Sequence, residues 1–409
     1  MAIVVQKYGG TSMGSVERIQ AVAERVGATQ RAGNQVVVVV SAMSGETNRL
    51  LDLAHKLAAQ PVEREVDVLL ATGEQASTAL LAIALQEKGV PARTFQGHQI
   101  RIDTDSAYGR ARIRSIDGDS LRGALSAGQV AVVAGFQGVD AEGHITTLGR
   151  GGSDTSAVAV AAALQADACE IYTDVDGVYT TDPRICPAAR KLARISHDEM
   201  LELASLGAKV LHIRSVEFAK RYNVPLCVRS SFDNSEGTWV VPEDAAMEQV
   251  LVSGVSLDRD QAKITIRHVP DKPGLASRVL GPIAQANIVV DMIIQNASSA
   301  GDTDLTFTLP KTDFRRALGM VEQTAMDIGA QGVVSDTEVV KVSVVGLGMR
   351  SHAGVAARMF DILAREGINI QMISTSEIKI SVVIEAKYGE LAVRALHRAL
   401  VEEAPATEA

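Results

Sequence analysis

Apolar runs and helical patterns alternate along the first 230 residues of the chain. Four short apolar runs read as strands buried on both faces, as in a parallel sheet: 2–6, 36–40, 130–134 and 168–172. Between and after them, apolar residues recur with helical spacing over 16–29, 47–59, 74–88 and 155–164. Strands separated by helices predict βαβ units, so this region is expected to be an α/β domain with a mostly parallel central sheet.

The alternation stops at a polar segment that ends in glycine, residues 230–237. Such segments are typical of loops between domains. We therefore predict one domain over residues 1–230, a linker over 231–249 and a further region over 250–409.

The region after residue 250 contains an internal repeat with an offset of 80 positions. Residues 274–293 overlay residues 354–373 without a gap, and seven of the twenty positions are identical. The pattern of each copy predicts a strand, a turn with glycine, a helix, two strands and a second helix, in that order. Such a βαββα unit needs one more strand, and two tandem copies can supply it by packing side by side or across a dimer.

Composition narrows the classes of function. The 46% of hydrophobic residues and 3% of aromatics suit closely packed α/β layers, and 409 residues suffice for two or three domains. A net charge of -9 without a basic run argues against a nucleic-acid partner. Three scattered cysteines, Cys169, Cys186 and Cys227, show neither metal spacing nor a disulfide framework, which favours a reducing cytoplasm. The first residues lack a signal-peptide pattern, and no apolar run approaches the roughly 18–20 residues of a membrane helix, so no membrane partner is expected.

The first candidate site follows the first predicted strand. Lys7 is followed by Tyr8 and by the pair Gly9 and Gly10. Glycines let backbone N–H groups approach an anion, and a lysine adds a positive charge beside them. The Walker pattern Gly-x-x-x-x-Gly-Lys-Ser/Thr is absent from the sequence, and a strand followed by two glycines also fits an ordinary tight turn.

A second candidate loop, residues 146–156, precedes the alanine- and valine-rich helical pattern. Ser153 or Asp154 could simply cap that helix. Capping does not explain Arg150, which stands among Gly149, Gly151 and Gly152. Glycines before a helix expose free N–H groups, and an arginine there can bind a carboxylate with two hydrogen bonds.

A third loop follows the predicted strand 168–172 and runs to Arg184. Its aspartates, tyrosine and arginine suit a nucleotide pocket, although Asp-Gly and Asp-Pro pairs are also ordinary turn signals. A fourth element places Lys209 after a glycine at a predicted helix start, where a lysine is usually solvent-facing.

Together these segments resemble the aspartokinase family. The similarity lies in residues 7–12, 40–48, 73–74, 149–154 and 173–179, which occur in the order and spacing of that family. The repeat resembles its paired ACT regulatory domains. The resemblance spans essentially the whole chain and implies an amino acid kinase fold, with helices on both faces of the sheet, followed by two βαββαβ ACT domains. It also implies a first ACT domain over about 262–335 and a second over about 339–400, the latter completed by the strand 251–256.

The resemblance implies transfer of a phosphoryl group from MgATP to the side-chain carboxylate of L-aspartate, giving 4-phospho-L-aspartate for lysine, threonine and methionine biosynthesis. A carboxylate is already ionised at pH 7, so no general base is needed. The residues implied in catalysis are Lys7, Asp154 and Lys209. Those implied at aspartate are Ser41, Thr47, Glu74, Arg150, Gly151, Gly152 and Ser153. Those implied at ATP are Lys7, Gly9, Gly10, Thr173, Asp174, Tyr179, Asp182, Arg184 and Lys209, and Mg²⁺ is expected to arrive with ATP without direct protein ligands.

The same resemblance implies feedback inhibition by lysine, threonine or both at the ACT repeat. The residues implied at effectors are Asp271, Gly274, Leu275, Val290, Asp291, Gln295, Val355, Asn369 and Ile370. The second copy lacks the loop aspartate of the first, so the two copies are expected to differ in affinity or role, and one of them could serve only packing. A homodimer or higher oligomer through the ACT domains is expected, with a separately expressed regulatory subunit starting near Met247 as a further possibility.

Two other functions fit parts of this pattern. One is an amino acid kinase that acts on glutamate, acetylglutamate or UMP, which the paired repeat and the loop around Arg150 disfavour. The other is an amino-acid sensor with an inactive kinase domain, which the joint presence of Lys7, Glu74, Arg150 and Asp154 disfavours.

Overall fold

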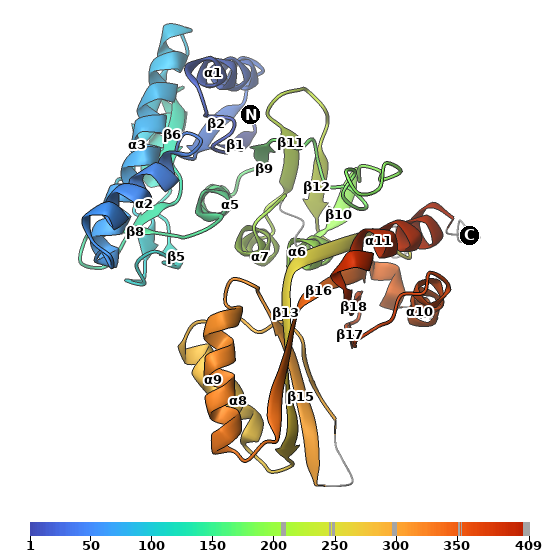
Figure 1. Cartoon of the computed structure of the whole chain (residues 1–409). Coiled ribbons are helices and arrows are strands. Elements are labelled where there is room, and N and C mark those ends of the chain that lie inside the picture. Colours follow the sequence, from blue (N-terminus) through green and yellow to red (C-terminus); the bar gives the residue numbers. More distant parts are fainter. Residues whose placement is uncertain are drawn as a thin grey trace. The chain divides into compact units, whose positions relative to one another are not determined.

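Valine-rich segments of the amino-terminal region meet in one eight-stranded sheet (Figure 1). The computed structural model describes residues 1–205, 210–244, 247, 250–296, 301–350, 352 and 354–403, and the sheet order is β10-β12-β11-β9-β1-β2-β6-β3. Every pairing in it is parallel except that of β11 with β12. The strands are β1 (Ile3–Tyr8), β2 (Gln35–Val40), β3 (Ala92–Phe95), β6 (Val130–Ala134), β9 (Ala168–Thr173), β10 (Arg194–Ser196), β11 (Leu226–Ser230) and β12 (Thr238–Val241).

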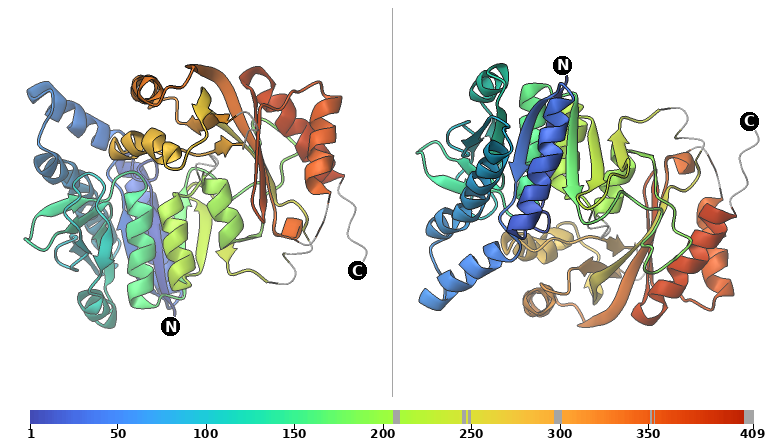
Figure 2. Two further views of the ribbon diagram at one scale, coloured as in Figure 1. Left: turned by 90° about the horizontal axis from the view of Figure 1, so that it is seen from below. Right: turned by 90° about the horizontal axis from the view of Figure 1, so that it is seen from above.

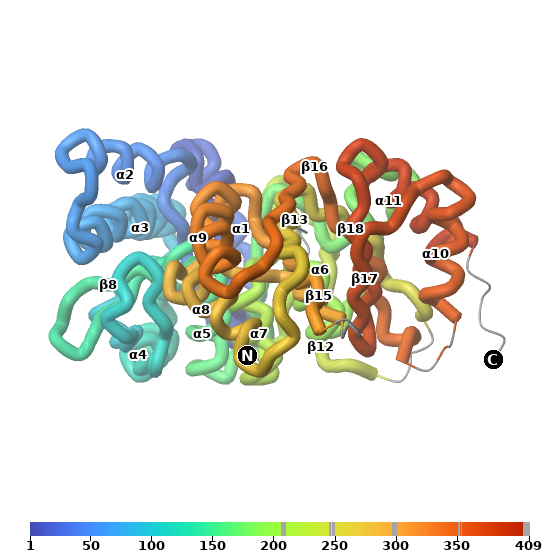
Figure 3. The backbone as a smooth tube through the Cα atoms, turned by 60° about the horizontal axis from the view of Figure 1, so that its bottom comes forward, coloured from blue at the N-terminus to red at the C-terminus, as the bar shows by residue number. Residues whose placement is uncertain are grey.

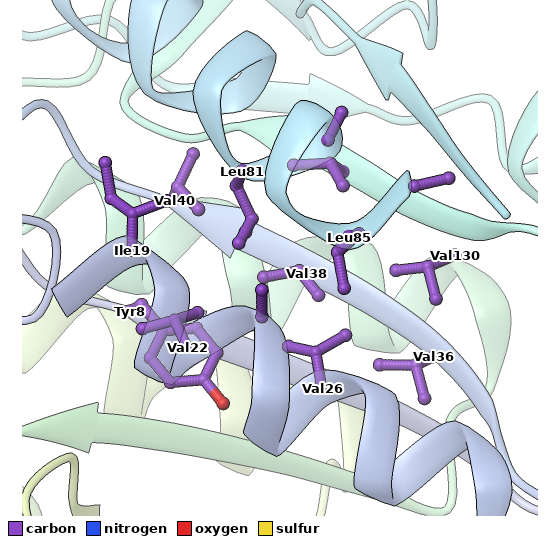
Figure 4. Close-up of a cluster of buried hydrophobic side chains, with 14 of the residues drawn as sticks. Tyr8, Ile19, Val22, Val26, Val36, Val38, Val40, Leu81, Leu85 and Val130 are labelled. Carbon is purple, nitrogen blue, oxygen red and sulfur yellow. The ribbon is translucent and has the colours of Figure 1, made fainter. Parts of the chain in front are cut away.

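Helices cover both faces of this sheet, as predicted (Figure 2). On one face, α1 and α3 pack against the even-numbered valines of β2, where Ile19, Val38 and Leu81 are buried together (Figure 4). On the other face, α5 packs on β1 and β2 beside α7. The helices are α1 (Val16–Arg31), α2 (Glu46–Leu57), α3 (Glu63–Glu87), α4 (Asp119–Ser126), α5 (Gly152–Leu164), α6 (His197–Ser205) and α7 (Ile213–Tyr222).

Helix α3 begins eleven residues before the predicted 74–88, at Glu63. The prediction began the helix after Gly73, because glycine disfavours helix interiors. In the structure Gly73 allows close packing, since a Cβ built there would lie 2.8 Å from the Cβ of Ala42. Within the described residues, α3 is the one helix long and apolar enough to cross a membrane, contrary to the expectation of none. Half of its most apolar window is buried inside the protein, as in the core helix of a soluble fold, so the feature is weak support for a membrane span.

A small second sheet lies beside α3, in the order β5-β4-β7-β8. Its strands are β4 (Asp103–Thr104), β5 (Ile113–Ser115), β7 (Gln137–Val139) and β8 (Ile145–Thr147). Strand β8 leads directly into the loop of Arg150, so this sheet and its contacts with α3 determine where that loop lies.

The division of the chain into compact units differs from the predicted boundaries. One unit comprises Met1–Tyr179 and Lys191–Asp244, and the other comprises Thr180–Arg190 and Ala245–Ala409. The polar segment 230–237 is the connection between the antiparallel strands β11 and β12, because Thr238–Val241 returns to the first sheet. A segment of the predicted kinase domain, Thr180–Arg190, therefore belongs to the second unit.

The second unit is built on a six-stranded sheet in the order β14-β15-β13-β16-β18-β17. Its strands are β13 (Gly254–Pro270), β14 (Ile293–Gln295), β15 (Asp302–Leu309), β16 (Gly332–Val345), β17 (Met372–Thr375) and β18 (Lys379–Glu385). The long antiparallel strands β13 and β16 run through both copies of the repeat. Figure 3 shows α8 (Leu275–Gln285) beside α9 (Phe314–Asp327), and α10 (Val355–Arg365) beside α11 (Gly389–His397).

The offset of 80 is reproduced in three dimensions. Helices α8 and α10 begin 80 residues apart, and each follows a glycine in the left-handed region, Gly274 at φ 90° and Gly354 at φ 97°. Each copy has its own apolar core. The segment Gly254–Ser256 pairs with residues 343–345, and Val255 is buried in the core of the second copy. The family resemblance implied this arrangement for residues 251–256, although the strand begins at Gly254.

His397 of α11 anchors the segment Thr180–Arg190 within the second unit. Its Nε2 lies 2.8 Å from the Thr180 hydroxyl, and its Nδ1 lies 2.8 Å from a Glu402 carboxylate oxygen. Cys186, His397 and Glu402 each offer one potential metal-ligand atom, and these three atoms lie within 4.8 Å of one another. Because both ring nitrogens already have hydrogen-bond partners, the cluster is accounted for as an anchor.

Candidate active site

Four parallel strands end side by side at one edge of the first sheet. Strand β9 ends at Thr173, and Lys7 lies one residue before the end of β1. Ser41 directly follows β2, and Gly135 directly follows β6, and the four strands are neighbours in the order β9-β1-β2-β6. Ligands of open α/β sheets bind outside the carboxyl ends of the strands. Three of the loops predicted from the sequence therefore start at the edge where a ligand pocket is expected.

Lys7 is paired with Asp154 at this edge. Strand β1 positions the lysine, and the first turn of α5 positions the aspartate, so that Nζ and Oδ1 lie 2.6 Å apart. Both side chains are about nine-tenths buried, with exposures of 11% and 12%. A Cβ at Gly9 would lie 3.4 Å from Nζ, so glycine keeps the approach to the ammonium group open. The ion pair carries no net charge, and Asp154 fixes the position of the Lys7 ammonium group.

The Lys7 turn is held against the loop that follows β2. The Ser41 N–H donates to the Tyr8 carbonyl at 3.0 Å. A Cβ at Gly10 would lie 3.2 Å from the Ala42 carbonyl oxygen, which is closer than most side chains tolerate. Thr47 lies in the first turn of α2, which this loop enters. Glycine at position 10 therefore lets the Lys7 turn and the loop after β2 pack against each other.

Glu74 is a buried carboxylate with one free oxygen. Its side chain projects from α3 and is 3% exposed. Oε1 accepts the Ala42 N–H at 2.9 Å, whereas Oε2 has no hydrogen-bond partner among the described residues. Burial raises the pKa of Glu74 to about 7, because removing the charge from water is only partly offset by that hydrogen bond. A buried unpaired carboxylate oxygen suits a cationic ligand group.

The loop of Arg150 depends on glycines. Gly149 and Gly151 have φ of 74° and 67°, the left-handed region that disfavours other residues. A Cβ at Gly151 would lie 2.1 Å from Cγ of His212, so the imidazole covers this glycine. Ser153 packs against Gly135 at the end of β6. The Arg150 side chain is exposed, and among the described residues it has no ion-pair partner, which leaves it available to an anion.

The predicted nucleotide residues divide into three groups. Thr173, Asp174 and Tyr179 belong to the first unit, where Thr173 donates to Asp174 at 3.1 Å and the Tyr179 hydroxyl donates to Asp176 at 2.9 Å. Asp182 and Arg184 belong to the second unit and are ion-paired at 2.7 Å. Lys209 lies outside the described residues.

Two buried or half-buried groups near the Arg150 loop were not predicted. Asp67 of α3 is fully buried and accepts hydrogen bonds from the backbone and hydroxyl of Thr147. Arg214 of α7 donates to the Leu148 carbonyl at 2.6 Å and to the Ala111 carbonyl at 2.9 Å. The only sequence signal for Asp67 was its position seven residues before Glu74, two helical turns away on the same face.

The predicted effector residues have mixed surroundings. Asp291 is ion-paired with Lys341, a lysine that is 3% exposed, so its carboxylate is already matched by a cation of the chain. Leu275 and Val355 are core side chains. The Asp271 N–H donates to the Gly301 carbonyl at 2.9 Å. Val290 and Ile370 are half-buried, and Gln295 and Asn369 are exposed.

Comparison with known proteins defines the class of this fold and site. A model of the amino acid kinase family matches residues 2–230, and models of ACT domains match residues 264–324 and 342–400. The chain is thus an amino acid kinase with two carboxyl-terminal ACT domains.

Full-length relatives narrow the class further. An aspartokinase of Pseudomonas aeruginosa is 61% identical over 410 residues, covering 100% of both chains. The crystal structure of E. coli aspartokinase III with aspartate and ADP (R-state) is 28% identical with a TM-score of 0.80, covering 97% of this chain and 99% of that one. The structure of that enzyme with lysine and aspartate (T-state) is 28% identical with a TM-score of 0.77, covering 98% and 99%. The chain belongs to the aspartokinase family, and its activity is that of an aspartate kinase.

Proposed function

We propose that this aspartate kinase transfers the terminal phosphoryl group of ATP to the side-chain carboxylate of L-aspartate at the edge formed by β9, β1, β2 and β6. The observation that carries this proposal is the buried pair of Lys7 and Asp154, beside a loop whose Ala42 N–H donates to Glu74. A fixed ammonium group suits the transferring phosphate, and a buried carboxylate suits the ammonium group of an amino acid.

The charges of the site complement a dicarboxylic amino acid and a nucleotide. Glu74 takes the ammonium group of aspartate, and Arg150 takes its α-carboxylate with two hydrogen bonds. Ser41, Thr47 and Ser153 complete the aspartate pocket. Lys7 contacts the phosphoryl group as it leaves ATP, where negative charge builds in the transition state, and Asp154 holds the lysine in place. Since the acceptor is already an anion, the chain supplies alignment and charge compensation instead of a base.

The nucleotide binds along the loops after β1 and β9, with Gly9 and Gly10 offering N–H groups and with Thr173, Asp174 and Tyr179 beside them. Mg²⁺ compensates phosphate charge in such reactions. In this chain the Asp154 carboxylate is engaged with Lys7 at 2.6 Å, so the donor set fits a cation held mainly by the phosphates. Asp182, Arg184 and Lys209 stay predicted nucleotide contacts.

One experiment tests the reaction directly. The full chain is incubated with MgATP, L-aspartate and hydroxylamine, which traps an acyl phosphate as a hydroxamate. We expect ATP-dependent aspartyl hydroxamate, and none with glutamate or acetylglutamate in place of aspartate. A product formed only with another acceptor would contradict the proposal, and ATP-independent hydroxamate would show that no phosphoryl transfer occurs.

We further propose feedback inhibition by lysine, threonine or both through the ACT repeat. The T-state structure of the E. coli relative contains lysine, which supports an amino-acid effector in this family. The αL glycines Gly274 and Gly354 place free helix N–H groups at equivalent points of the two copies, a geometry suited to an effector carboxylate. Bound effector would favour one of two conformations of the enzyme and so lower its activity. The hydroxamate assay with and without each amino acid tests this.

A homodimer or larger oligomer through the second unit is also proposed. Strands β14 and β17 are the edges of the six-stranded sheet, and Ile293 and Ile373 on them are 50% and 42% exposed. Exposed apolar edge strands commonly pair with another chain. Sedimentation of the full chain measures the state, and immunoblotting with an antibody to the carboxyl-terminal region tests for a regulatory subunit that starts near Met247.

A further inference from the structure

Asp67 joins helix α3 to the loop that carries Arg150. We propose that Asp67 is a positioning residue for aspartate binding, which holds the Arg150 loop at a fixed distance from Glu74. This inference rests on the proposed roles of Arg150 and Glu74. It adds a residue that does not itself touch the substrate.

The carboxylate of Asp67 accepts hydrogen bonds from the end of strand β8 and from the loop of Gly109. The Thr147 hydroxyl donates to Oδ1 at 2.7 Å, and the Thr147 N–H donates to Oδ2 at 2.7 Å. The Gly109 N–H lies 3.0 Å from both oxygens. Asp67 is 0% exposed, so each of these bonds forms away from water, where a lost partner is costly. The result is a rigid junction between α3, β8 and the loop of Gly109.

The same helix positions the opposite wall of the aspartate pocket. Glu74 lies seven residues after Asp67, nearly two full turns, so both side chains project from one face of α3. Glu74 holds the Ala42 N–H at 2.9 Å and thereby the loop of Ser41. One helix therefore sets the separation between the groups proposed to bind the ammonium group and the α-carboxylate of aspartate.

Arg150 needs such a support because its own loop is made of glycines. Thr147 is only three residues before Arg150, and Gly149 and Gly151 flank the arginine in the left-handed region. Arg214 holds the Leu148 carbonyl from the other side at 2.6 Å. Backbone hydrogen bonds also hold this segment, since the Leu148 N–H donates to the Phe136 carbonyl and the Thr147 carbonyl accepts the Ala111 N–H, each at 2.8 Å. Asp67 and Arg214 are charged side chains that add to these contacts.

The test is Asp67→Asn in the full chain. The amide keeps the size of the carboxylate but turns an NH₂ group toward an N–H or O–H donor, so at least one contact is lost. We expect the KM for aspartate to rise about tenfold or more, because a displacement of about 1 Å at a binding group has effects of that size or larger. The kcat at saturating aspartate and the KM for ATP should stay within about twofold of wild type.

Asp140→Asn is the matched control. Asp140 is also buried, at 5% exposure, and accepts the Glu142 and His144 N–H groups at 3.0 and 2.9 Å. It also accepts the Ser106 and Tyr108 hydroxyls at 3.1 and 3.0 Å, so it contacts the loop of Gly109 but makes no hydrogen bond to residues 147–152. As a control it therefore separates the effect of that loop from the effect of the contact with Thr147. We expect it to lower Tm and to leave the KM for aspartate unchanged. If Asp67→Asn unfolds, Thr147→Val, which removes one donor to Asp67, should raise the KM in the same direction by a smaller factor.

The double variant Asp67→Asn with Arg150→Ala shows whether Asp67 acts through Arg150. We expect its KM for aspartate to equal that of Arg150→Ala alone. A folded Asp67→Asn enzyme with wild-type KM would overturn the inference, as would an equal rise in Asp140→Asn or a multiplicative effect in the double variant. Loss of the proposed function is distinguishable, because wild-type enzyme would then form no aspartyl hydroxamate in the same assay.

Discussion

Glu74 makes the affinity for aspartate depend on pH. Its Oε2 is buried without a partner in the part of the chain that the structure describes, and burial raises the pKa of its carboxyl to about 7. The ammonium group of aspartate is expected to bind the ionised carboxylate, so bound substrate lowers this pKa. Aspartate affinity should therefore increase as pH rises through about 7, because a larger fraction of the free enzyme is ready to bind.

The size of the effect follows from the population of the ionised form. With a pKa of about 7, roughly one tenth of the free enzyme carries an ionised Glu74 at about pH 6, and roughly nine tenths at about pH 8. The apparent Kd for aspartate should thus fall by about tenfold over this range. Below pH 7, each aspartate bound should also release a fraction of a proton, approaching about one proton at pH 6.

Folding stability should respond in the opposite direction. The folded pKa of about 7 lies above the ordinary value of 4.5, so the folded state holds this proton more tightly than the unfolded state. The contribution of Glu74 to stability is fully present below about pH 4.5 and is lost as pH rises to about 7. Substrate affinity and the stability of the free enzyme therefore change in opposite senses between pH 6 and about 7.

Isothermal titration of aspartate into the full chain, at several pH values and in two buffers of different ionisation enthalpy, measures both Kd and proton release. Glu74→Gln is the control, since an amide cannot titrate; it should bind weakly and independently of pH across this range. A wild-type Kd that does not change between about pH 6 and 8 would refute the reasoning. Retention of the wild-type pH dependence in Glu74→Gln would assign that dependence to another group.

Three further substitutions test other parts of the site. Lys7→Ala should lower kcat by about 10²–10³-fold with a modest change in the KM for aspartate, because the ammonium group is needed most in the transition state; steady-state rates that match wild type would remove Lys7 from this role. Arg150→Ala should weaken aspartate binding by roughly 2–4 kcal/mol of free energy, seen as a higher KM, since it leaves the α-carboxylate unmatched. An unchanged KM would exclude the arginine from substrate binding. Asp291→Ala leaves the buried ammonium of Lys341 without its nearest partner and should destabilise the second unit by about 1–3 kcal/mol. Inhibition curves should shift to higher effector concentration while uninhibited kcat is spared. Unchanged inhibition together with an unchanged Tm would contradict both expectations.

Several elements were predictable because their signals are local. The valine run of β2 is buried on both faces, and its period and composition alone indicate a central parallel strand. The repeat was found by identity at an offset of 80, and helices α8 and α10 have that offset in the structure. By contrast, the first half of α3 was missed, because Gly73 is a helix-disfavouring residue whose role is to let Ala42 approach.

The contacts of the charged groups were less predictable. The family resemblance implied both Asp154 and Lys7 in catalysis, and the structure pairs the two. Asp291 was assigned to an effector, but its carboxylate meets Lys341, a residue 50 positions away that carried no signal of its own. A hydrophobic pattern reports which face of an element is buried, whereas an ion pair depends on where two distant elements meet.

The sequence by itself determined the class of fold, the order of its main elements and the duplicated carboxyl-terminal region, because these depend on periodicity, residue type and internal identity along the chain. The chemical groups of the candidate site were implied by the family resemblance. Only the tertiary structure decided that Thr180–Arg190 belongs to the second unit, that Glu74 keeps one oxygen free, and that Asp67 holds Thr147, 80 residues away. These depend on which distant backbone groups reach a buried carboxylate, and the cost of leaving such a group unpaired is paid only once the chain is folded.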